Sequence, residues 1–115
     1  LRGEAIEINQ NVVFDYLFVE DMEKIVEHFV SHFPTDKVIN ITPTNSISLL
    51  EIAKIVNSFG KKKVDIRIKN EVLNNEYTGD NTLLLKNYPE LQFTDIRDGL
   101  KNLYKYNKQN LLMGV

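Results

Sequence analysis

The chain has 115 residues, a length that allows one domain with a single hydrophobic core. Its formal net charge is −2, from 14 basic and 16 acidic side chains, so it lacks the strong basic field that attracts nucleic acid or anionic lipid. Because it has no cysteine, it cannot form disulfides or a zinc site that uses thiolates. No apolar run approaches the ~20 residues of a membrane span, so we expect a soluble cytoplasmic protein. The first residue is Leu1 rather than Met and no signal peptide follows, so we expect part of a longer protein.

The first predicted elements are a strand and a helix that follow each other without a loop. Residues 12–19 are rich in β-branched and aromatic side chains, which favour a half-buried strand. Glu20 and Asp21 then place negative charge where a helix exposes its first N–H groups. An apolar stripe at helical spacing follows, and Pro34 must end the helix. The stripe consists of Met22, Ile25, Val26, Phe29, Val30 and Phe33.

A second strand and helix are predicted in the middle of the chain. Residues 37–41 indicate a short buried strand, and the turn-forming residues 42–45 indicate a loop after it. Ser48 and Glu51 have the spacing of a capping box, in which each residue bonds the backbone N–H of the other, so a helix should begin there. Its buried face should contain Leu49, Ile52, Ala53 and Val56.

The end of this helix and the next strand are marked by clear local signals. We expect Gly60 to close the helix in a left-handed conformation. Residues 64–68 alternate apolar and charged side chains, which predicts a strand with one solvent-exposed face. The polar residues 69–75 then predict a loop.

Two further helices are predicted in the last third of the chain. Asp80 or Asn81 can cap a short helical segment over residues 83–85, which should end before the next proline. Thr94 is the expected N-cap of the final helix, and we expect the polar tail beyond residue 106 to fray. The inner face of the final helix should contain Ile96, Leu100, Leu103 and Tyr104.

Two clusters of ionisable residues have simpler explanations than a binding site. His28 and His32 lie four residues apart, the spacing at which two imidazoles can share a metal, but no third ligand is evident and we expect both to be solvated. The basic residues 61–63 follow a predicted helix, where cations complement the negative end of the helix dipole.

Aromatic residues offer a better indication of a pocket. Phe14 and Tyr77 could equally line a pocket for a nucleobase or sugar or belong to the core. We expect Tyr16 and Phe18 to be core residues, on the face of the predicted strand opposite Val19.

Four segments of the chain match motifs that occur together in one protein family. Residues 14–21 resemble an Arg-Asp-aromatic-aliphatic-(Tyr/His)-Val-(Asp/Glu)-Asp element, and residues 39–53 resemble a strand with Asn followed by a Ser-capped helix. Residues 77–84 resemble a Tyr-x-x-Asp segment, and residues 91–100 resemble a closing helix with (Asp/Glu)-Gly-(Leu/Ile). In this order, and over most of the chain, the segments resemble the NAD-dependent epimerase/dehydratase family, the extended short-chain dehydrogenases/reductases.

The chain departs from the family pattern where that pattern contacts phosphate. The family's first element often begins with an arginine that reaches the diphosphate of a sugar nucleotide, whereas this chain has Phe14 there. Lys69 is the only cation near the place of a second phosphate-contacting arginine. Thr42 and Thr44 stand where the family has glycine, and Leu83 stands where it has a cation. The resemblance therefore leaves the substrate open.

The residues that would bind a dinucleotide and perform the chemistry are not in this sequence. No Gly-x-x-Gly-x-x-Gly loop can be built from its five glycines. Tyr104 and Lys108 have the spacing of the family's catalytic Tyr-x-x-x-Lys, but they follow the closing-helix motif in a tail rich in tyrosine and lysine, and we reject them as a chance match. We expect no catalytic, cofactor-binding or metal-ligating residue in this chain.

The resemblance implies a small α/β domain of short strands and three to four helices, equivalent to the C-terminal substrate-binding part of a Rossmann-type enzyme and spanning residues 1–115. It implies that an upstream Rossmann half binds NAD or NADP and carries the catalytic residues. Phe14, Asn40, Asn75 and Tyr77 are then expected to contact a sugar or sugar nucleotide. The resemblance leaves the reaction open among epimerisation, dehydration and reduction, and it leaves homo-oligomerisation open.

Two other kinds of function are compatible with the same sequence. The chain could be a free-standing nucleotide- or sugar-binding module, which would bind ligand as a monomer. It could also be a protein-interaction domain that docks through its apolar helix faces. A contiguous exposed apolar patch would favour a chain that packs against a partner.

Overall fold

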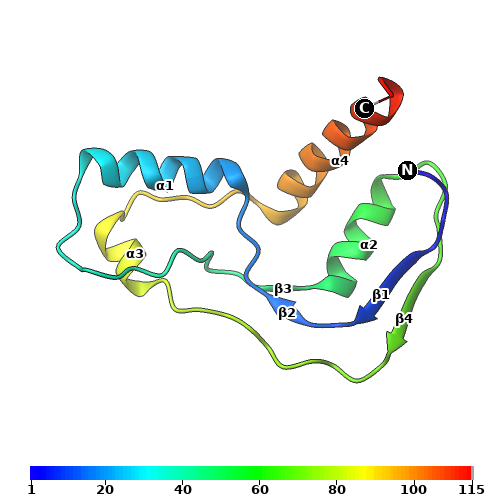
Figure 1. Cartoon of the computed structure of the whole chain (residues 1–115), viewed down its shortest axis with the longest axis horizontal. Helices are drawn as coiled ribbons and strands as arrows, with labels where there is room; N and C mark the ends of the chain where they lie inside the picture. Colours follow the sequence, from blue (N-terminus) through cyan, green and yellow to red (C-terminus); the bar gives the residue numbers. More distant parts are fainter. Residues whose placement is uncertain (115) are drawn as a thin grey trace.

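The computed structural model describes residues 1–114, and in this range the chain forms four helices and two sheets of two strands each (Figure 1). The elements in chain order are β1 (Ile6–Gln10), β2 (Val13–Phe14), α1 (Val19–Ser31), β3 (Ile47–Ser48), α2 (Leu49–Phe59), β4 (Ile66–Asn70), α3 (Thr82–Asn87) and α4 (Ile96–Leu112). This small mixed arrangement of helices and short strands confirms the predicted fold class. α1 and α3 lie at one end of the molecule, and the β1–β4 pair lies at the other (Figure 1).

The longer sheet is a parallel pair that encloses α2 in its connection. β1 aligns with β4 so that Ile6 lies opposite Ile66 and Ile8 lies opposite Ile68. Parallel strands need a long crossover, and the segment between them includes α2. β1 was not among the predicted elements, although the alternation of Ile6 and Ile8 with polar neighbours is the usual sign of a strand with one buried face.

The strand predicted over residues 12–19 is much shorter in the structure. Only Val13 and Phe14 pair, as β2, with Ser48 and Ile47 of β3. β3 cannot continue because Ser48 is already the N-cap of α2, so the partner strand ends after two residues. Residues 15–18 lie outside any strand, and α1 begins at Val19, the residue at which the predicted strand was expected to end.

The predicted capping box of α2 is confirmed. The Ser48 hydroxyl accepts a hydrogen bond from Glu51 N (3.2 Å), and the Glu51 carboxylate accepts one from Ser48 N (3.1 Å). The prediction for Gly60 is wrong, since it is extended (φ −73°, ψ 145°) rather than left-handed. Instead, the Lys63 ammonium donates to the backbone carbonyls of residues 57, 58 and 60, which satisfies the end of the helix.

The next predicted strand does form, but it lies later in the chain than the sequence predicted. The alternation predicted over residues 64–68 forms β4 at Ile66–Asn70, two residues later. The strand predicted over residues 37–41 does not form, because in residues 1–114 no strand pairs with this segment. Ile39 and Ile41 are instead half-buried against the core from an extended loop.

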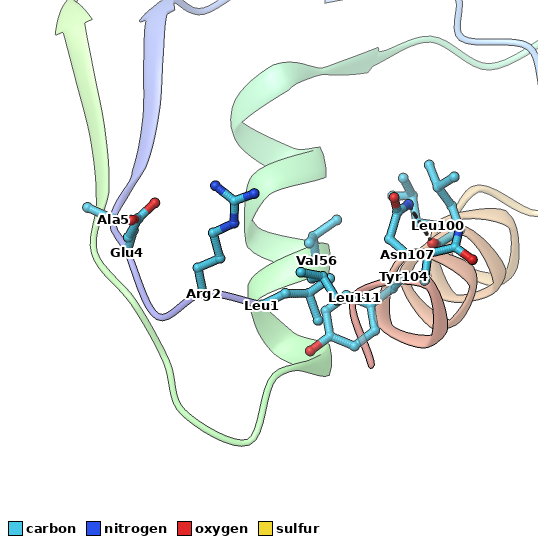
Figure 2. A pocket seen from close by; sticks show the side chains of 11 residues that line it. Leu1, Arg2, Glu4, Ala5, Val56, Leu100, Tyr104, Asn107 and Leu111 are labelled. Carbon is cyan, nitrogen blue, oxygen red and sulfur yellow. Dashed lines mark hydrogen bonds between the residues drawn. The ribbon is translucent and has the colours of Figure 1, made fainter. Parts of the chain in front are cut away.

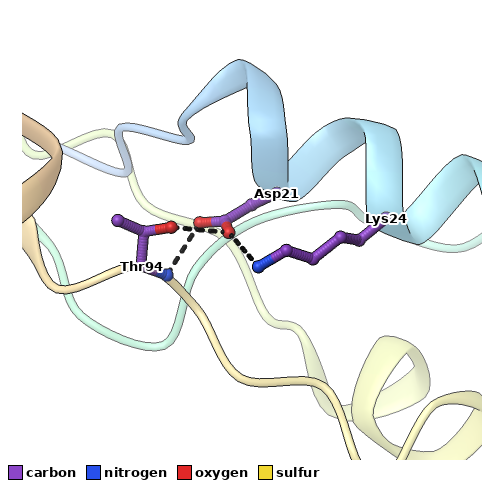
Figure 3. Close-up of polar contacts among 3 residues, drawn as sticks. All are labelled: Asp21, Lys24 and Thr94. Carbon is purple, nitrogen blue, oxygen red and sulfur yellow. Dashed lines mark hydrogen bonds and ion pairs between the residues drawn. The ribbon is translucent and has the colours of Figure 1, made fainter. Parts of the chain in front are cut away.

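The last helix begins and ends differently from the sequence prediction. Asp95, not Thr94, caps α4, and its side chain accepts hydrogen bonds from Arg97 N and Asp98 N. Thr94 is bound instead by the carboxylate of Asp21 from α1 (Figure 3). α4 continues through the tail that was expected to fray, as far as Leu112. Leu103, predicted to face inward, is half exposed.

The buried core is small, and the chain is extended. Ile25, Leu84 and Leu91 form its centre, and half-buried side chains surround it. The surrounding side chains are Phe29, Ile39, Ile41, Leu85, Tyr88 and Phe93. The Cα radius of gyration is 17.0 Å, whereas a compact domain of this length has about 13 Å. Much of the apolar surface therefore remains exposed to solvent, including one side of α1.

α1 is apolar on two sides, but the structure covers only one. Ile25 is fully buried, and Phe29 packs against the core beside it. Val26 and Val30, which the sequence placed in the same buried stripe, are 50% and 68% exposed. Phe33, beyond the end of the helix, is also exposed.

Candidate functional site

Three of the four predicted ligand-contacting residues meet at one pocket. Phe14, Asn40 and Tyr77, from three distant parts of the sequence, line a cavity of about 570 Å³. The other residues that line it are Asp15, Tyr16, Ile41, Thr42, Thr78 and Gly79. We call this cavity the aromatic pocket. Its walls come from the end of β2 and the two residues that follow it, from the loop before β3 and from the loop before α3.

Three aromatic rings form one side of the aromatic pocket. The Phe14 ring meets Tyr16 edge to face, with centroids 5.9 Å apart, and meets Tyr77 in the same way at 6.0 Å. Phe14 and Tyr16 are two residues apart in extended backbone, so their side chains lie on the same side. Tyr77 reaches them because its backbone bridges to Phe14 and its N–H donates to Val13 O. Tyr16, predicted to be a core residue, therefore belongs to the pocket.

Asp15 connects the walls of the pocket. Its Oδ2 accepts a hydrogen bond from the Thr42 hydroxyl (2.6 Å) and another from Gly79 N (2.6 Å). A side chain at Gly79 would bring its Cβ within 3.2 Å of Thr42 Cγ2, so the two loops approach each other closely at this point. Sequence reasoning did not single out Asp15, although it matches the Asp of the family's first element.

Neutral side chains connect the two loops that contribute to the pocket. Asn40 donates to the backbone carbonyl of Asp80 (3.4 Å), and Asn81 donates to Thr42 O and to the Thr44 hydroxyl (3.1 Å each). These bonds hold the loop before β3 against the loop before α3. The sequence named Asn40 through the resemblance and considered Asn81 only as a helix cap.

Asn75 lies outside the part of the pocket that the structure describes. It is exposed, and its backbone N–H is held by the side chain of Asn74 (2.9 Å). Its contact with a ligand remains a prediction.

The charge of the aromatic pocket is negative. Among its described lining residues, Asp15 carries the one carboxylate, and there is no Lys, Arg or His. Burial raises the pKa of the Tyr16 phenol from 10.0, so that ring stays neutral. At the rim, hydrogen bonds from the hydroxyl and N–H of Thr82 lower the pKa of Asp80, which keeps its carboxylate ionised.

A larger cavity, of about 710 Å³, lies between α2, α4 and the start of the chain. Figure 2 shows Leu1 near Val56 of α2 and near Tyr104 and Leu111 of α4. Its walls are mainly aliphatic, and they include none of the predicted site residues. Tyr104 also contacts Phe59, with ring centroids 5.8 Å apart. We interpret this cavity as a gap between packed helices. Tyr104, the first residue of the rejected Tyr-x-x-x-Lys match, lines it.

His28 of α1 and His32, the residue after its end, are stacked rather than simply solvated. The His28 ring lies parallel to Tyr88 at 3.8 Å and to His32 at 4.6 Å, and His28 Nε2 is 3.1 Å from Asn87 O. His28 is therefore half-buried, contrary to the sequence expectation. In residues 1–114 no group of three or more His, Cys, Asp or Glu side chains is placed to hold a metal ion. Over the same range, no helix is long and apolar enough to cross a membrane.

Comparison with known proteins gives one informative result. No protein-family model matches the sequence, and no curated protein sequence matches it significantly. The structure is similar to that of UDP-glucuronic acid 4-epimerase from Bacillus cereus in complex with NAD, with a TM-score of 0.65 at 20% sequence identity. The match covers 91% of this chain and 32% of the epimerase. The chain therefore has the fold of about a third of a Rossmann-type epimerase, as the resemblance implied.

Proposed function

We propose that this chain is the substrate-binding part of an NAD(P)-dependent sugar epimerase, dehydratase or reductase. Its role is to hold the sugar or sugar nucleotide while another part of the protein performs the chemistry. The observation that carries this proposal is the meeting of Phe14, Asn40 and Tyr77 at one pocket. They are separated by up to 63 residues in sequence, and the fold that brings them together is shared with a part of an epimerase solved with NAD.

The aromatic pocket has the chemistry of a sugar site. Aromatic rings such as Phe14 and Tyr77 pack against the C–H faces of a pyranose, while Asp15, Asn40 and Thr78 offer hydrogen-bonding groups for its hydroxyls. A bound nicotinamide would supply the hydride chemistry. The residues of this chain would orient the sugar and exclude water from it.

The uncovered side of α1 supports a second part of the proposal, which is that the Rossmann half of the same protein packs here. The helix presents a row of apolar side chains to solvent: Val19, Met22, Val26 and Val30. A groove of about 650 Å³ continues this surface, between the start of α1 and the outer side of α4. Leu103 and Tyr106 line the groove from α4. An apolar surface of this extent on a small chain marks a region that a partner covers.

Ligand binding by the native-length protein tests the proposed function. We expect UDP-sugars to bind, as measured by isothermal titration calorimetry, and Tyr77→Ala to weaken binding roughly fivefold because a stacked aromatic contact is worth about 1 kcal/mol. Leu73→Ala is the matched control, since it also truncates an exposed apolar side chain before α3. No binding of any UDP-sugar, or equal effects of the two substitutions, would contradict the proposal.

The exposed side of α1 also favours one alternative, a protein-interaction domain that acts without a Rossmann half. The intact mass of the protein from its source cells separates the two. We expect a mass more than twice the 13.3 kDa of this chain, with a glycine-rich loop and a Tyr-x-x-x-Lys upstream. A native mass near that of this chain would favour the interaction domain.

A further inference from the structure

We propose that the aromatic pocket selects a sugar that carries an ammonium group, and that it discriminates against a sugar that carries a carboxylate. This inference rests on the proposed function and specifies the substrate class. Three observations support it: the lack of a cation in the described lining of the pocket, the Oδ1 atom of Asp15, and the aromatic rings of Phe14, Tyr16 and Tyr77.

The pocket has no group that could neutralise an anion. Its described lining contains the Asp15 carboxylate and no cationic side chain. A further carboxylate lies beside it on Glu76, which accepts a hydrogen bond from the hydroxyl of the lining residue Thr78 (3.1 Å). A ligand carboxylate placed here would lose hydration and meet only like charge, both of which raise its free energy.

Asp15 can serve a cation without losing its structural role. Both of its hydrogen bonds, from Thr42 and from Gly79, are made by Oδ2. In the part of the chain that the structure describes, Oδ1 receives no hydrogen bond. An ammonium donor can therefore bind Oδ1 while Oδ2 continues to hold the two loops together, and such a bond to an ionised acceptor is roughly twice as strong as a neutral one.

The rings provide the rest of a cation site. Phe14 lies between Tyr16 and Tyr77, with centroid distances of 5.9 and 6.0 Å. The face of an aromatic ring carries partial negative charge and attracts an ammonium within about 6 Å of its centroid. Tyr16 and Tyr77 also carry phenol hydroxyls, so they add hydrogen-bonding groups to the site. Three rings and one carboxylate together match an organic cation.

Three sugar nucleotides built on the glucose ring test the inference. UDP-glucosamine carries an ammonium at C2, UDP-glucuronic acid carries a carboxylate at C6, and the sugar of UDP-glucose is neutral and differs from each of the other two at one position. They should be titrated into the native-length protein by calorimetry at about pH 6, where the amine is protonated. We expect UDP-glucosamine to bind at least roughly tenfold more tightly than UDP-glucuronic acid, with UDP-glucose between them. The preference should shrink as salt screens it.

Two variants assign the preference to the pocket. Asp15→Asn keeps an acceptor for the Thr42 hydroxyl but removes the charge, so the ratio of affinities should fall towards one. Phe14→Arg adds a cation to the pocket without touching the Asp15 hydrogen bonds, and it should shift the preference towards UDP-glucuronic acid. Val72→Arg adds the same charge at an exposed site away from the pocket, and it should leave the ratio unchanged.

The outcomes separate this inference from the proposed function. If none of the three nucleotides binds, the proposed function fails and the inference fails with it. If they bind with equal affinity, or if UDP-glucuronic acid binds most tightly, the charge selection is wrong while the sugar-binding function stands. If the Asp15→Asn protein is unfolded by circular dichroism, Phe14→Arg decides the question, and an unchanged ratio in that variant would overturn the inference.

Discussion

Replacing Asp21 by alanine should have a large effect on stability, because this carboxylate ties the start of α1 to the start of α4. Asp21 is 1% exposed. Its Oδ2 accepts from Thr94 N (2.9 Å), and its Oδ1 accepts from the Thr94 hydroxyl (2.8 Å) and from the Lys24 ammonium (3.3 Å) (Figure 3). The residues it joins are 73 positions apart in sequence.

The magnitude follows from these three bonds. A hydrogen bond to a charged group contributes about 1.5 kcal/mol or more to the free energy of unfolding, so the two bonds to Thr94 together give about 3 kcal/mol. Lys24 is about half exposed, and its ion pair with Asp21 adds less than about 1 kcal/mol. We therefore expect Asp21→Ala to lower the free energy of unfolding by about 3 kcal/mol and Tm by roughly 10 °C.

Urea denaturation followed by circular dichroism measures this loss. Glu20→Ala is the matched control, because it removes a neighbouring carboxylate that is exposed, and it should change stability by less than about 0.5 kcal/mol. Thr94→Val keeps the N–H bond and should cost about half as much as Asp21→Ala. The reasoning is refuted if Asp21→Ala costs less than about 1 kcal/mol, or if Glu20→Ala costs as much.

Three further predictions concern α4, α2 and α1. Gly99→Ala should lower the free energy of unfolding by about 1 to 3 kcal/mol, because a Cβ at Gly99 would collide with the Phe18 ring. This is the opposite of the usual effect of alanine, which normally stabilises a helix. Unchanged or higher stability in thermal unfolding would show that the ring moves aside. Hydrogen bonds from the N–H and hydroxyl of Ser48 lower the pKa of Glu51 from 4.5, so its contribution to stability is present above the unfolded pKa and is lost as pH falls through the folded pKa. In acid-range denaturation series the Glu51→Gln protein should therefore lose less stability than the wild type below about pH 4.5, and parallel curves would contradict this assignment. If the Rossmann half covers α1, Val26→Asp should lower the free energy of unfolding of the native-length protein by about 1 to 3 kcal/mol. Glu27→Asp is the control and should leave the stability unchanged. Equal stabilities of the two variants would mean that this side of α1 stays exposed.

The parts of the fold that local sequence determines were predictable. Ser48 and Glu51 are three residues apart and bond each other, so their capping box could be recognised without knowing the rest of the chain. Strands need a partner, and the sequence around residues 37–41 has strand character but does not pair. β1 pairs with β4 sixty residues later, as the register of Ile6 with Ile66 shows. Pairing, not propensity, decided which segments became strands.

The candidate site was predictable where the resemblance or the aromatic residues pointed to it. Phe14, Asn40 and Tyr77 were expected together because they stand at positions of the family motifs, although Phe14 replaces the family's arginine, and all three line one pocket. Asp15 was missed because its two partners, Thr42 and Gly79, are 27 and 64 residues away. Asp21 was recognised as a helix-start charge, but its bond to Thr94 depends on tertiary structure that the local pattern does not contain.

The pocket has a consequence for how the chain folds. Its walls lie at residues 14–16, 40–42 and 77–79, and the bonds that close it from Asp15 connect positions far apart in sequence. Such long-range contacts form slowly, because the chain must lose the entropy of closing long loops before the bonds that stabilise the closed state can form. During synthesis, a nascent chain that has not yet reached Gly79 lacks the third wall. A ligand can therefore stabilise only chains in which all three walls have already come together, so binding is a late event in folding.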